Sequence, residues 1–291
     1  MQPNKSCRIF NSDSAMKKTF ILAFALLTLL SCSCHQPVLR LASYNIRGNQ
    51  ERDGINQWQF RKDTLTQIIL RKGFKLVGLQ EAVPDQLADI ISLTGYKWVG
   101  ADSLYDPIIY DPSRIEVLNW DMFWLNEGNV PGVAGWDGKY DRYCTWGQFK
   151  DVESGKEFMV FNTHLDHRGI EARPKGAALI CAKADSLKKA LYNHKDIPVI
   201  IMGDQNSWDN TETYAIYTSH YRDARAISKL VLGPLGTAHN FGGVHPVRID
   251  YFFVNDCVEV QEYNALDIVF GERYDHFPSD HYPIYIDVLF K

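Results

Sequence analysis

The sequence lacks several features that would assign it to a special class of protein. Its 291 residues contain no internal repeat, no low-complexity segment and no Gly/Ser/Pro-rich run that would mark a linker. No pair of its six cysteines has the spacing of a zinc finger. It also has no excess of basic residues, since its formal net charge is -4. These absences argue against a repeat protein, a chain of several linked domains and a zinc-finger module.

The composition is that of a folded domain. A hydrophobic content of 45% and an aromatic content of 13% argue against disorder. The roughly 260 residues after the N-terminal segment suit one large α/β domain. Cys144, Cys181 and Cys257 fall in a predicted strand, helix and strand, where buried thiols are the favoured interpretation. A disulfide among them stays open.

The N-terminal segment resembles a bacterial lipoprotein signal. Basic residues at 17–18 precede an apolar run, and a small residue precedes Cys32. The run is shorter than the ~20 residues that span a bilayer, which disfavours a transmembrane anchor. We therefore expect residues 1–15 to be an extension from an upstream start codon, 16–31 a signal peptide and 32–37 a tether. Lipidation of Cys32 would place the exported protein on a membrane of a bacterial cell envelope.

Removal of this segment makes the chain more acidic. The residues before Cys32 carry a net charge of +3, so the mature protein would carry -7. An acidic surface repels polyphosphate, so long nucleic acid would need a local basic groove and metal screening. No basic run in the sequence predicts such a groove.

A buried strand that ends in a carboxylate and a carboxamide is the central motif. Residues 199–203 are apolar or small, follow the breaker Pro198 and lead to Asp204 and Asn206. The carboxylate can ligate a metal or accept a proton, and the amide can donate to a developing anion. An ordinary turn uses the same residue types. Alone, the motif leaves both interpretations open.

Other predicted strands have the same kind of chemistry at their ends. In chain order the residues are Asn45, Glu81, His164 with Asp166 beyond it, Asp250 and the pair Asp280-His281. Strand ends at one edge of a sheet are where α/β proteins gather reactive groups. The sequence therefore predicts one polar site built from distant segments.

This ordered set resembles the endonuclease/exonuclease/phosphatase superfamily of metal-dependent phosphohydrolases. The resemblance implies a four-layer α/β/β/α sandwich over residues 38–291, in which two packed mixed β-sheets are flanked by helices. Two residues depart from the pattern: Tyr44 stands where many members have Trp, and Arg47 stands where some nucleases have an acid. The second departure bears on one accessory metal contact and not on the core site.

The resemblance also implies a divalent metal, Mg²⁺ or Mn²⁺. Glu81 would be its best ligand, with Asn45 beside it and Asp280 as the second carboxylate. Such a cation supplies much of what phosphate-ester hydrolysis needs. The alternative for Glu81 is an acid stabilised by the N-terminal dipole of the helix that Pro84 opens.

The other motif residues would act on water and phosphate. By the family pattern, His281 would activate or orient water and Asp250 would accept its other ring proton. Asp204 would hold the attacking water or share the role of base. Asn206 and His164 would donate to the phosphoryl oxygens.

Substrate contacts are predicted from two side chains and one loop. Arg173 would contact phosphate or pair with an acid, and Trp208 would line a substrate pocket or pack in the core. The Gly-rich loop at 126–141 is either an irregular surface loop or a lid.

Periodicity and breakers predict the order of elements. Helices are expected at 56–71, with Phe60, Leu65, Ile68 and Ile69 toward the core, at 84–95 and at 171–192. Further strands are expected at 108–110, 115–125, 143–150, 157–163, 248–254 and 282–289, and 143–163 reads as a hairpin.

Three function classes follow. The first is a phosphodiesterase or phosphatase acting on a small or lipid-linked phosphate ester, which the acidic mature chain and the lipoprotein signal favour. The second is a secreted nuclease acting on DNA or RNA. The third is a binding protein with a dead site, which is disfavoured because every core catalytic residue type is present. We expect a monomer, attached to a membrane through its N-terminal lipid.

Overall fold

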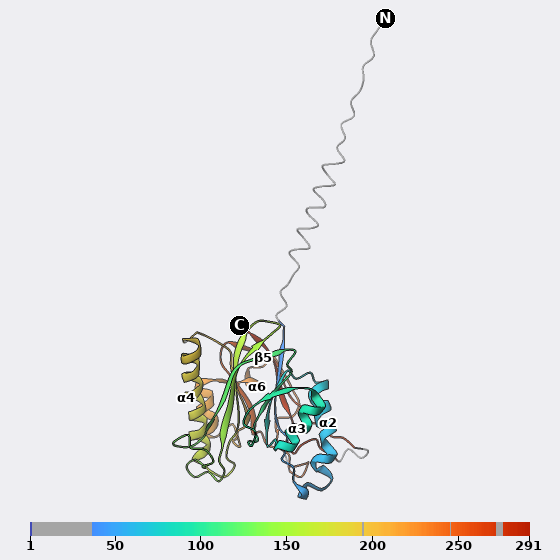
Figure 1. The fold of residues 1–291 in the computed structure, drawn as a ribbon, viewed down its shortest axis with the longest axis vertical. Coiled ribbons are helices and arrows are strands. Elements are labelled where there is room, and N and C mark those ends of the chain that lie inside the picture. The colour runs from blue at the N-terminus through green and yellow to red at the C-terminus, as the bar shows by residue number, and fades with distance from the viewer. Residues whose placement is uncertain (2–36, 194, 245, 272–275) are drawn as a thin grey trace. The chain divides into compact units, whose positions relative to one another are not determined.

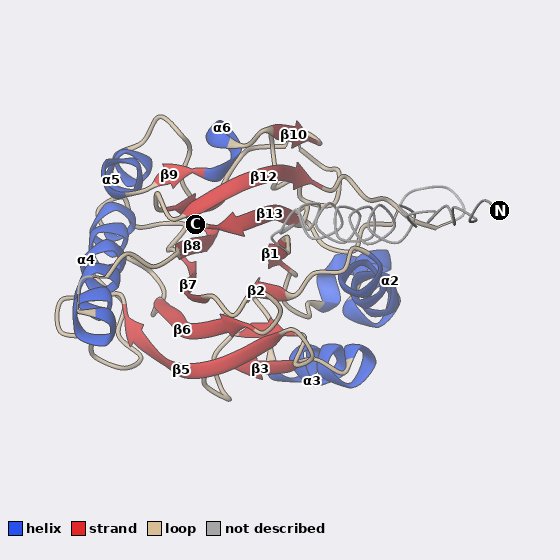
Figure 2. Ribbon diagram, turned by 90° about the horizontal axis from the view of Figure 1, so that it is seen from above, coloured by secondary structure: helices blue, strands red, loops and turns tan. Residues whose placement is uncertain are grey.

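Two β-sheets stack face to face, and helices cover their outer faces. In Figure 2, α4 (Ala172–Tyr192) and α5 (Glu212–His220) lie on one side, with α2 (Trp58–Arg71) and α3 (Pro84–Thr94) on the other. The remaining helices are the short η1 (Glu51–Asn56) and α6 (Ala224–Ile227). The predicted four-layer sandwich is confirmed (Figure 1).

The computed structural model describes residues 1, 37–193, 195–244, 246–271 and 276–291. Residues Pro37–Lys291 form one compact unit. The predicted signal peptide at 16–31, Cys32 and the tether up to residue 36 lie outside the described residues. Among the helices that are described, none is long and apolar enough to cross a membrane.

Both sheets are mixed. The seven-stranded sheet has the order β10-β12-β13-β1-β2-β4-β3, and the six-stranded sheet has the order β5-β6-β7-β8-β11-β9. The strands of the first are β1 (Leu39–Asn45), β2 (Leu76–Gln80), β3 (Lys97–Val99), β4 (Ile108–Tyr110), β10 (Leu230–Leu232), β12 (Val258–Ala265) and β13 (Ile284–Phe290). The strands of the second are β5 (Ile115–Trp124), β6 (Tyr143–Asp151), β7 (Glu157–His164), β8 (Val199–Asp204), β9 (Arg222–Asp223) and β11 (Asp250–Val254). At the centre of each sheet a parallel pair, β1–β2 or β7–β8, places two carboxyl ends side by side.

The largest hydrophobic cluster lies between the two sheets. Leu41 and Ile286 from the first sheet, with Phe158, Ile200 and Phe252 from the second, belong to it and are fully buried. Burying each such side chain contributes about 1.5–3 kcal/mol. Two further clusters join α4 and α5 to the second sheet and α2 and α3 to the first.

The two sheets are in close contact at Gly78 and Asn162. A Cβ on Gly78 of β2 would lie 2.5 Å from Asn162 Oδ1 and 2.6 Å from the Cε atom of Met202, so only glycine fits. The Asn162 amide donates to the Leu79 carbonyl at 2.8 Å and accepts from Gln80 Nε2 at 2.7 Å. A buried hydrogen-bonded link therefore fixes the two sheets relative to each other.

Several local predictions need correction. Helix α2 begins at Trp58 and buries Trp58, Arg61, Leu65, Ile68 and Ile69, whereas Phe60 is 55% exposed. Position 60 lies roughly 200° around the helix from position 58, which places it on the opposite face.

The other corrections concern strand ends. Strand β11 starts at Asp250 instead of 248, and β13 starts at Ile284, after Pro283, which has no N–H for a ladder. Cys257 lies in the turn between β11 and β12 and not in a strand. Cys144 and Cys181 are buried, and all three cysteines are free thiols. The hairpin around Gly155 and the helix end at Gly95 are as predicted.

Candidate active site

Asp204 lies at the centre of the polar residues of the second sheet. It ends β8, where the register pairs it with His164 of β7 on one side and Asp250 of β11 on the other. The residue before it, Gly203, has φ 138°, and a Cβ there would lie 1.9 Å from the Thr163 carbonyl oxygen. The Gly-Asp sequence thus permits the close strand approach that brings Asp204 Oδ2 to 3.4 Å from His164 Nε2.

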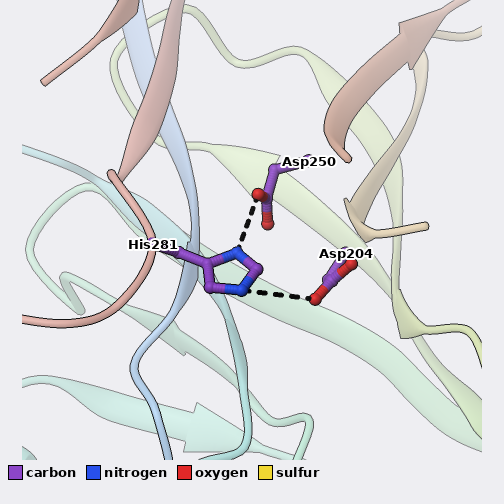
Figure 3. Close-up of side chains that lie close together, drawn as sticks. All are labelled: Asp204, Asp250 and His281. Atoms are coloured by element: carbon purple, nitrogen blue, oxygen red, sulfur yellow. Dashed lines mark hydrogen bonds and ion pairs between the residues drawn. The ribbon is translucent and has the colours of Figure 1, made fainter. Parts of the chain in front are cut away.

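His281 lies between two carboxylates (Figure 3). Its Nδ1 donates to Asp250 Oδ2 at 2.9 Å, and its Nε2 lies 3.8 Å from Asp204 Oδ2. Burial lowers the pKa of His281, but the charges of Asp250, Asp204 and Asp280 outweigh it and the pKa is raised well above its usual value. Burial, followed by the charge of Asp250, raises the pKa of Asp204 to about 7.

Asn45 and Glu81 come from the ends of β1 and β2 in the other sheet. The Asn45 amide donates to Glu81 Oε1 at 3.3 Å and to Asp204 Oδ2 at 3.0 Å. Glu81 adopts a left-handed φ of 60°, and its Oε2 accepts the Gly48 N–H at 3.1 Å. Burial raises the pKa of Glu81, but the Gly48 N–H, the His281 charge and the Asn45 amide outweigh this and lower it. The carboxylate faces the site, and its hydrogen bonds are not to the N-terminus of α3.

Asp280 enters from the loop before β13, beside Arg47. Arg47 Nη1 lies 3.4 Å from Asp280 Oδ2, while its other nitrogens make two hydrogen bonds of 3.0 Å to Asp53. Burial raises the pKa of Asp280, and the charge of Glu81 adds to the increase. The structure thus brings Glu81 and Asp280 within electrostatic reach of each other.

The sequence model of the Endonuclease/Exonuclease/phosphatase family matches residues 42–281. The chain belongs to this family. Members generally hydrolyse phosphate esters and typically depend on a divalent metal. No curated protein matches the chain in sequence.

Several solved structures of the family resemble this chain. A Bacteroides vulgatus endonuclease/exonuclease/phosphatase is 32% identical, with a TM-score of 0.80, and the match covers 88% of this chain and 100% of that one. A Bacteroides thetaiotaomicron mannosyl-6-phosphatase is 30% identical, also with a TM-score of 0.80, over 87% of this chain and 100% of that one. D. rerio TDP2 complexed with a single-strand DNA product is 18% identical, with a TM-score of 0.66 over 87% and 99% of the two chains, and shows the fold alone.

The donor set fits the hard divalent cation of the family. Asn45, Glu81 and Asp280 offer oxygen atoms, and the charge of Glu81 helps to raise the pKa of Asp280, a cost of ionisation that a bound cation would remove. Asp250 Oδ1 is also buried without a hydrogen-bond partner among the described residues. Ligand atoms of Asp204, Asp250 and His281 lie within 4.8 Å of one another, but His281 Nδ1 and Asp250 Oδ2 are already hydrogen-bonded to each other.

Asn206 lies beside the site with a left-handed φ of 45°. Its N–H donates to Asp204 Oδ1 at 2.9 Å, and its side-chain amide donates to the Leu165 carbonyl at 2.9 Å. One of its two side-chain amide hydrogens is therefore used to bind the segment after β7. The role of the other toward phosphate stays a prediction.

Arg173 and Trp208 occupy different environments. Arg173 Nη1 donates to the Asp166 carbonyl at 3.1 Å, and Arg173 has no ion pair with a described acid. Trp208 is 57% exposed, which excludes packing in the core, and it lines a groove of about 390 Å³ with Leu235, Pro246 and Val247. Of the two, Trp208 has the exposed ring that a substrate contact requires.

The loop at 126–141 is tied to the segment after β7. The Asp137 carboxylate accepts the N–H groups of residues 170–172, at 2.7 Å, 3.0 Å and 2.8 Å in that order. The Asp166 carboxylate accepts those of Lys139 and Tyr140 at 3.0 Å and 2.8 Å. This favours the irregular surface loop over the lid.

Sequence reasoning missed three charged residues near the site. Arg142 begins the hairpin beside His164, and its Nε is buried without a hydrogen-bond partner among the described residues. Burial raises the pKa of Asp106 to about 7, next to Glu81 and Arg142. Arg61 is fully buried and donates to the carbonyls of Arg47 and Pro278, which joins the Asn45 and Asp280 loops. Arg142 and Asp106 could have been predicted from the sequence because each is a charged residue just before a strand, β6 or β4.

Proposed function

We propose that this protein is a divalent-metal-dependent hydrolase of phosphate esters that acts on a small or lipid-linked substrate. The hydrogen bond of 3.0 Å between Asn45 Nδ2 and Asp204 Oδ2 carries the proposal. This hydrogen bond connects Asn45, one of the residues suited to bind a metal, to Asp204, one of the residues suited to activate water. A binding protein without catalysis would have no need to bring these two sets together.

The water-activating set consists of Asp204, His281 and Asp250. Asp250 accepts the Nδ1 proton, so the Nε2 edge of His281 is directed toward Asp204. A water held by Asp204 can pass its proton to that carboxylate as it attacks phosphorus, while His281 orients the water and balances the carboxylate charge. Asp250 keeps His281 in the required tautomer.

Phosphoryl oxygens would be bound by His164, Asn206 and Arg142. Burial, followed by the charges of Arg142 and other neighbours, lowers the pKa of His164 well below its usual value, so its imidazole is neutral. A neutral imidazole N–H and an amide N–H are donors that stabilise charge developing on those oxygens. The guanidinium of Arg142 adds a positive charge on the same side.

Asn45, Glu81 and Asp280 would hold the cation, Mg²⁺ or Mn²⁺. When bound, it would neutralise charge on the phosphoryl oxygens and on the leaving oxygen. Arg47 Nη1 lies 3.4 Å from Asp280 Oδ2. Some nucleases have an acidic residue at this position, which would favour an additional metal contact that Arg47 cannot make.

The similar mannosyl-6-phosphatase, at 30% identity, supports a small sugar phosphate as one substrate class to test. The formal net charge of -4 disfavours binding of a polyanionic substrate, so DNA or RNA is only the second candidate substrate. We further propose that the protein is exported and held on a membrane through lipidated Cys32.

The test is hydrolysis of p-nitrophenyl phosphate and of methyl p-nitrophenyl phosphate by protein from Pro37 onward, with Mg²⁺, with Mn²⁺ and with EDTA. Turnover that requires metal supports the proposal. Absence of turnover on these esters, on sugar phosphates and on oligonucleotides would overturn it. Mass spectrometry of the envelope-extracted protein tests the lipid at Cys32.

A further inference from the structure

One side of the site carries a concentration of positive charge. Lys139 and Arg142 lie over the ring of Tyr140, and Arg168 follows His167, whose ring also contacts Tyr140. We call Lys139, Arg142 and Arg168 the cationic cluster. Lys139 Nζ and Arg142 Cζ lie 5.3 Å and 5.4 Å from the centre of that ring, and the His167 ring centre lies 5.2 Å away. The cluster stands out in a chain with a formal net charge of -4.

This charge has no acidic partner. Within the described part of the chain, no member of the cationic cluster forms an ion pair, whereas Arg40, Arg114 and Arg248 each pair with an aspartate. The Nε of Arg142 is buried and makes no hydrogen bond to a described residue. A buried donor on a charged group is costly unless something binds it.

The nearby acids are already engaged or too distant. Asp166 accepts four backbone N–H groups, those of Lys139, Tyr140, Arg168 and Gly169, at 2.6–3.0 Å. Asp106 affects Arg142 electrostatically but forms no ion pair with it. Asp141 is exposed to solvent. The nearby acids therefore do not neutralise the cluster.

The cationic cluster is adjacent to the phosphoryl-binding residues. Cys144 pairs with Thr163 in the β6–β7 register, so Arg142, two residues before Cys144, lies at the end of the hairpin that carries His164. The charge of Arg142 acts on His164, which belongs to the proposed phosphate site. A phosphate monoester carries about -1.5 to -2 at pH 7 because its second pKa is near 6, whereas a diester carries a single charge. Each added cation therefore favours the monoester more than the diester.

We infer that the cationic cluster, with Arg142 at its centre, selects the dianionic phosphate group of monoesters over the monoanionic group of diesters. This inference rests on the proposed function and narrows it to a phosphomonoesterase. The chemical class of the substrate is thus a phosphomonoester of a small alcohol.

The experiment compares the two chromogenic esters, which share a leaving group, at pH 8. For wild type, Arg142→Gln, Lys139→Gln and the control Arg71→Gln, kcat/KM is measured on the monoester and on the diester with Mg²⁺ or Mn²⁺. Arg71 is an exposed arginine at the end of α2, remote in sequence from the cluster. We expect the monoester-to-diester ratio to fall about tenfold or more in Arg142→Gln and less in Lys139→Gln, and to stay unchanged in Arg71→Gln.

The outcomes separate this inference from the proposed function. No turnover of either ester by wild type counts against the proposed function itself. Turnover with an unchanged ratio in Arg142→Gln, an equal loss on both esters, or activity of wild type on the diester alone overturns the inference. Circular dichroism checks folding, and if Arg142→Gln fails to fold, the exposed Lys139 and Arg168 variants decide by the same ratio.

Discussion

Asp137 and Asp166 lie on two neighbouring loops, and the carboxylate of each accepts hydrogen bonds from the backbone of the other's loop. Burial raises the pKa of Asp166, but its N–H donors outweigh this and lower it. The exchange holds the Gly-rich loop at a fixed position beside the site. It also presents Lys139 and Tyr140 toward His167.

Replacing Asp166 with alanine should destabilise the protein by about 1–3 kcal/mol, because several N–H groups lose a charged acceptor. Urea unfolding measures this, with exposed Asp185→Ala as the control. Since the folded pKa is lowered, this contribution is complete above the unfolded pKa near 4 and is lost as pH falls through the lower folded value. An Asp166→Ala protein as stable as wild type at pH 7 would contradict the account.

Glu81→Gln should lower metal affinity by about 10-fold or more, because a ligand carboxylate becomes a neutral amide of the same size. Calorimetric titration with Mn²⁺ measures it, and exposed Glu116→Gln on β5 is the matched control. Glu81→Ala and His281→Ala should abolish hydrolysis and leave the far-UV circular dichroism spectrum unchanged. Retained turnover in either would refute the site assignment.

Asp250→Asn should lower kcat by roughly 10²–10⁴-fold with little change in KM, because His281 loses the acceptor that fixes its tautomer. The Asp250 charge raises the pKa of His281, so His281 should titrate at lower pH in the variant than in wild type. Nitrogen NMR of the metal-free protein across pH measures that shift. An unaltered His281 titration would show that Asp250 does not act through the imidazole.

Trp208→Ala should raise KM by several-fold for the substrate and change kcat little, if its exposed ring contacts the alcohol portion and not the reacting phosphate, as we predict. The measurement compares KM for a panel of sugar phosphates with the inhibition constant of inorganic phosphate, which has no alcohol portion. Trp120→Ala removes a comparably exposed ring on β5 and should leave KM unchanged. Equal effects of both variants would argue against a contact at Trp208.

Gly78→Ala should destabilise the fold by about 1–3 kcal/mol, because its Cβ would overlap Asn162 and Met202. It should also lower kcat at temperatures where secondary structure is intact. Thermal unfolding followed beside activity tests this, with Gly128→Ala in the surface loop as the control. Activity that falls only when the sheets melt would contradict the prediction.

The order of elements could be predicted from the sequence because each buried strand is apolar and ends abruptly in a polar residue. Glu81 was found in this way and His281 from its place just before a strand, and the family resemblance supplied their roles. Arg61, Asn162 and Arg142 were not predicted. Arg61 and Asn162 bond to backbone groups of distant segments, and Arg142 Nε has no described partner, so no local sequence pattern shows the role of any of them. Phe60 was misplaced because its hydrophobicity suggested burial where the helix phase excludes it.

The residues of the proposed site come from both sheets. Asn45 and Glu81 end β1 and β2, and Asp280 and His281 precede β13 of the same sheet, whereas His164, Asp204 and Asp250 belong to the other. A chain in which either sheet forms alone therefore carries half of a site. The proposed activity therefore requires both sheets to be packed together. A chain that is still being synthesised, or that is transported unfolded, would leave the phosphate esters around it intact.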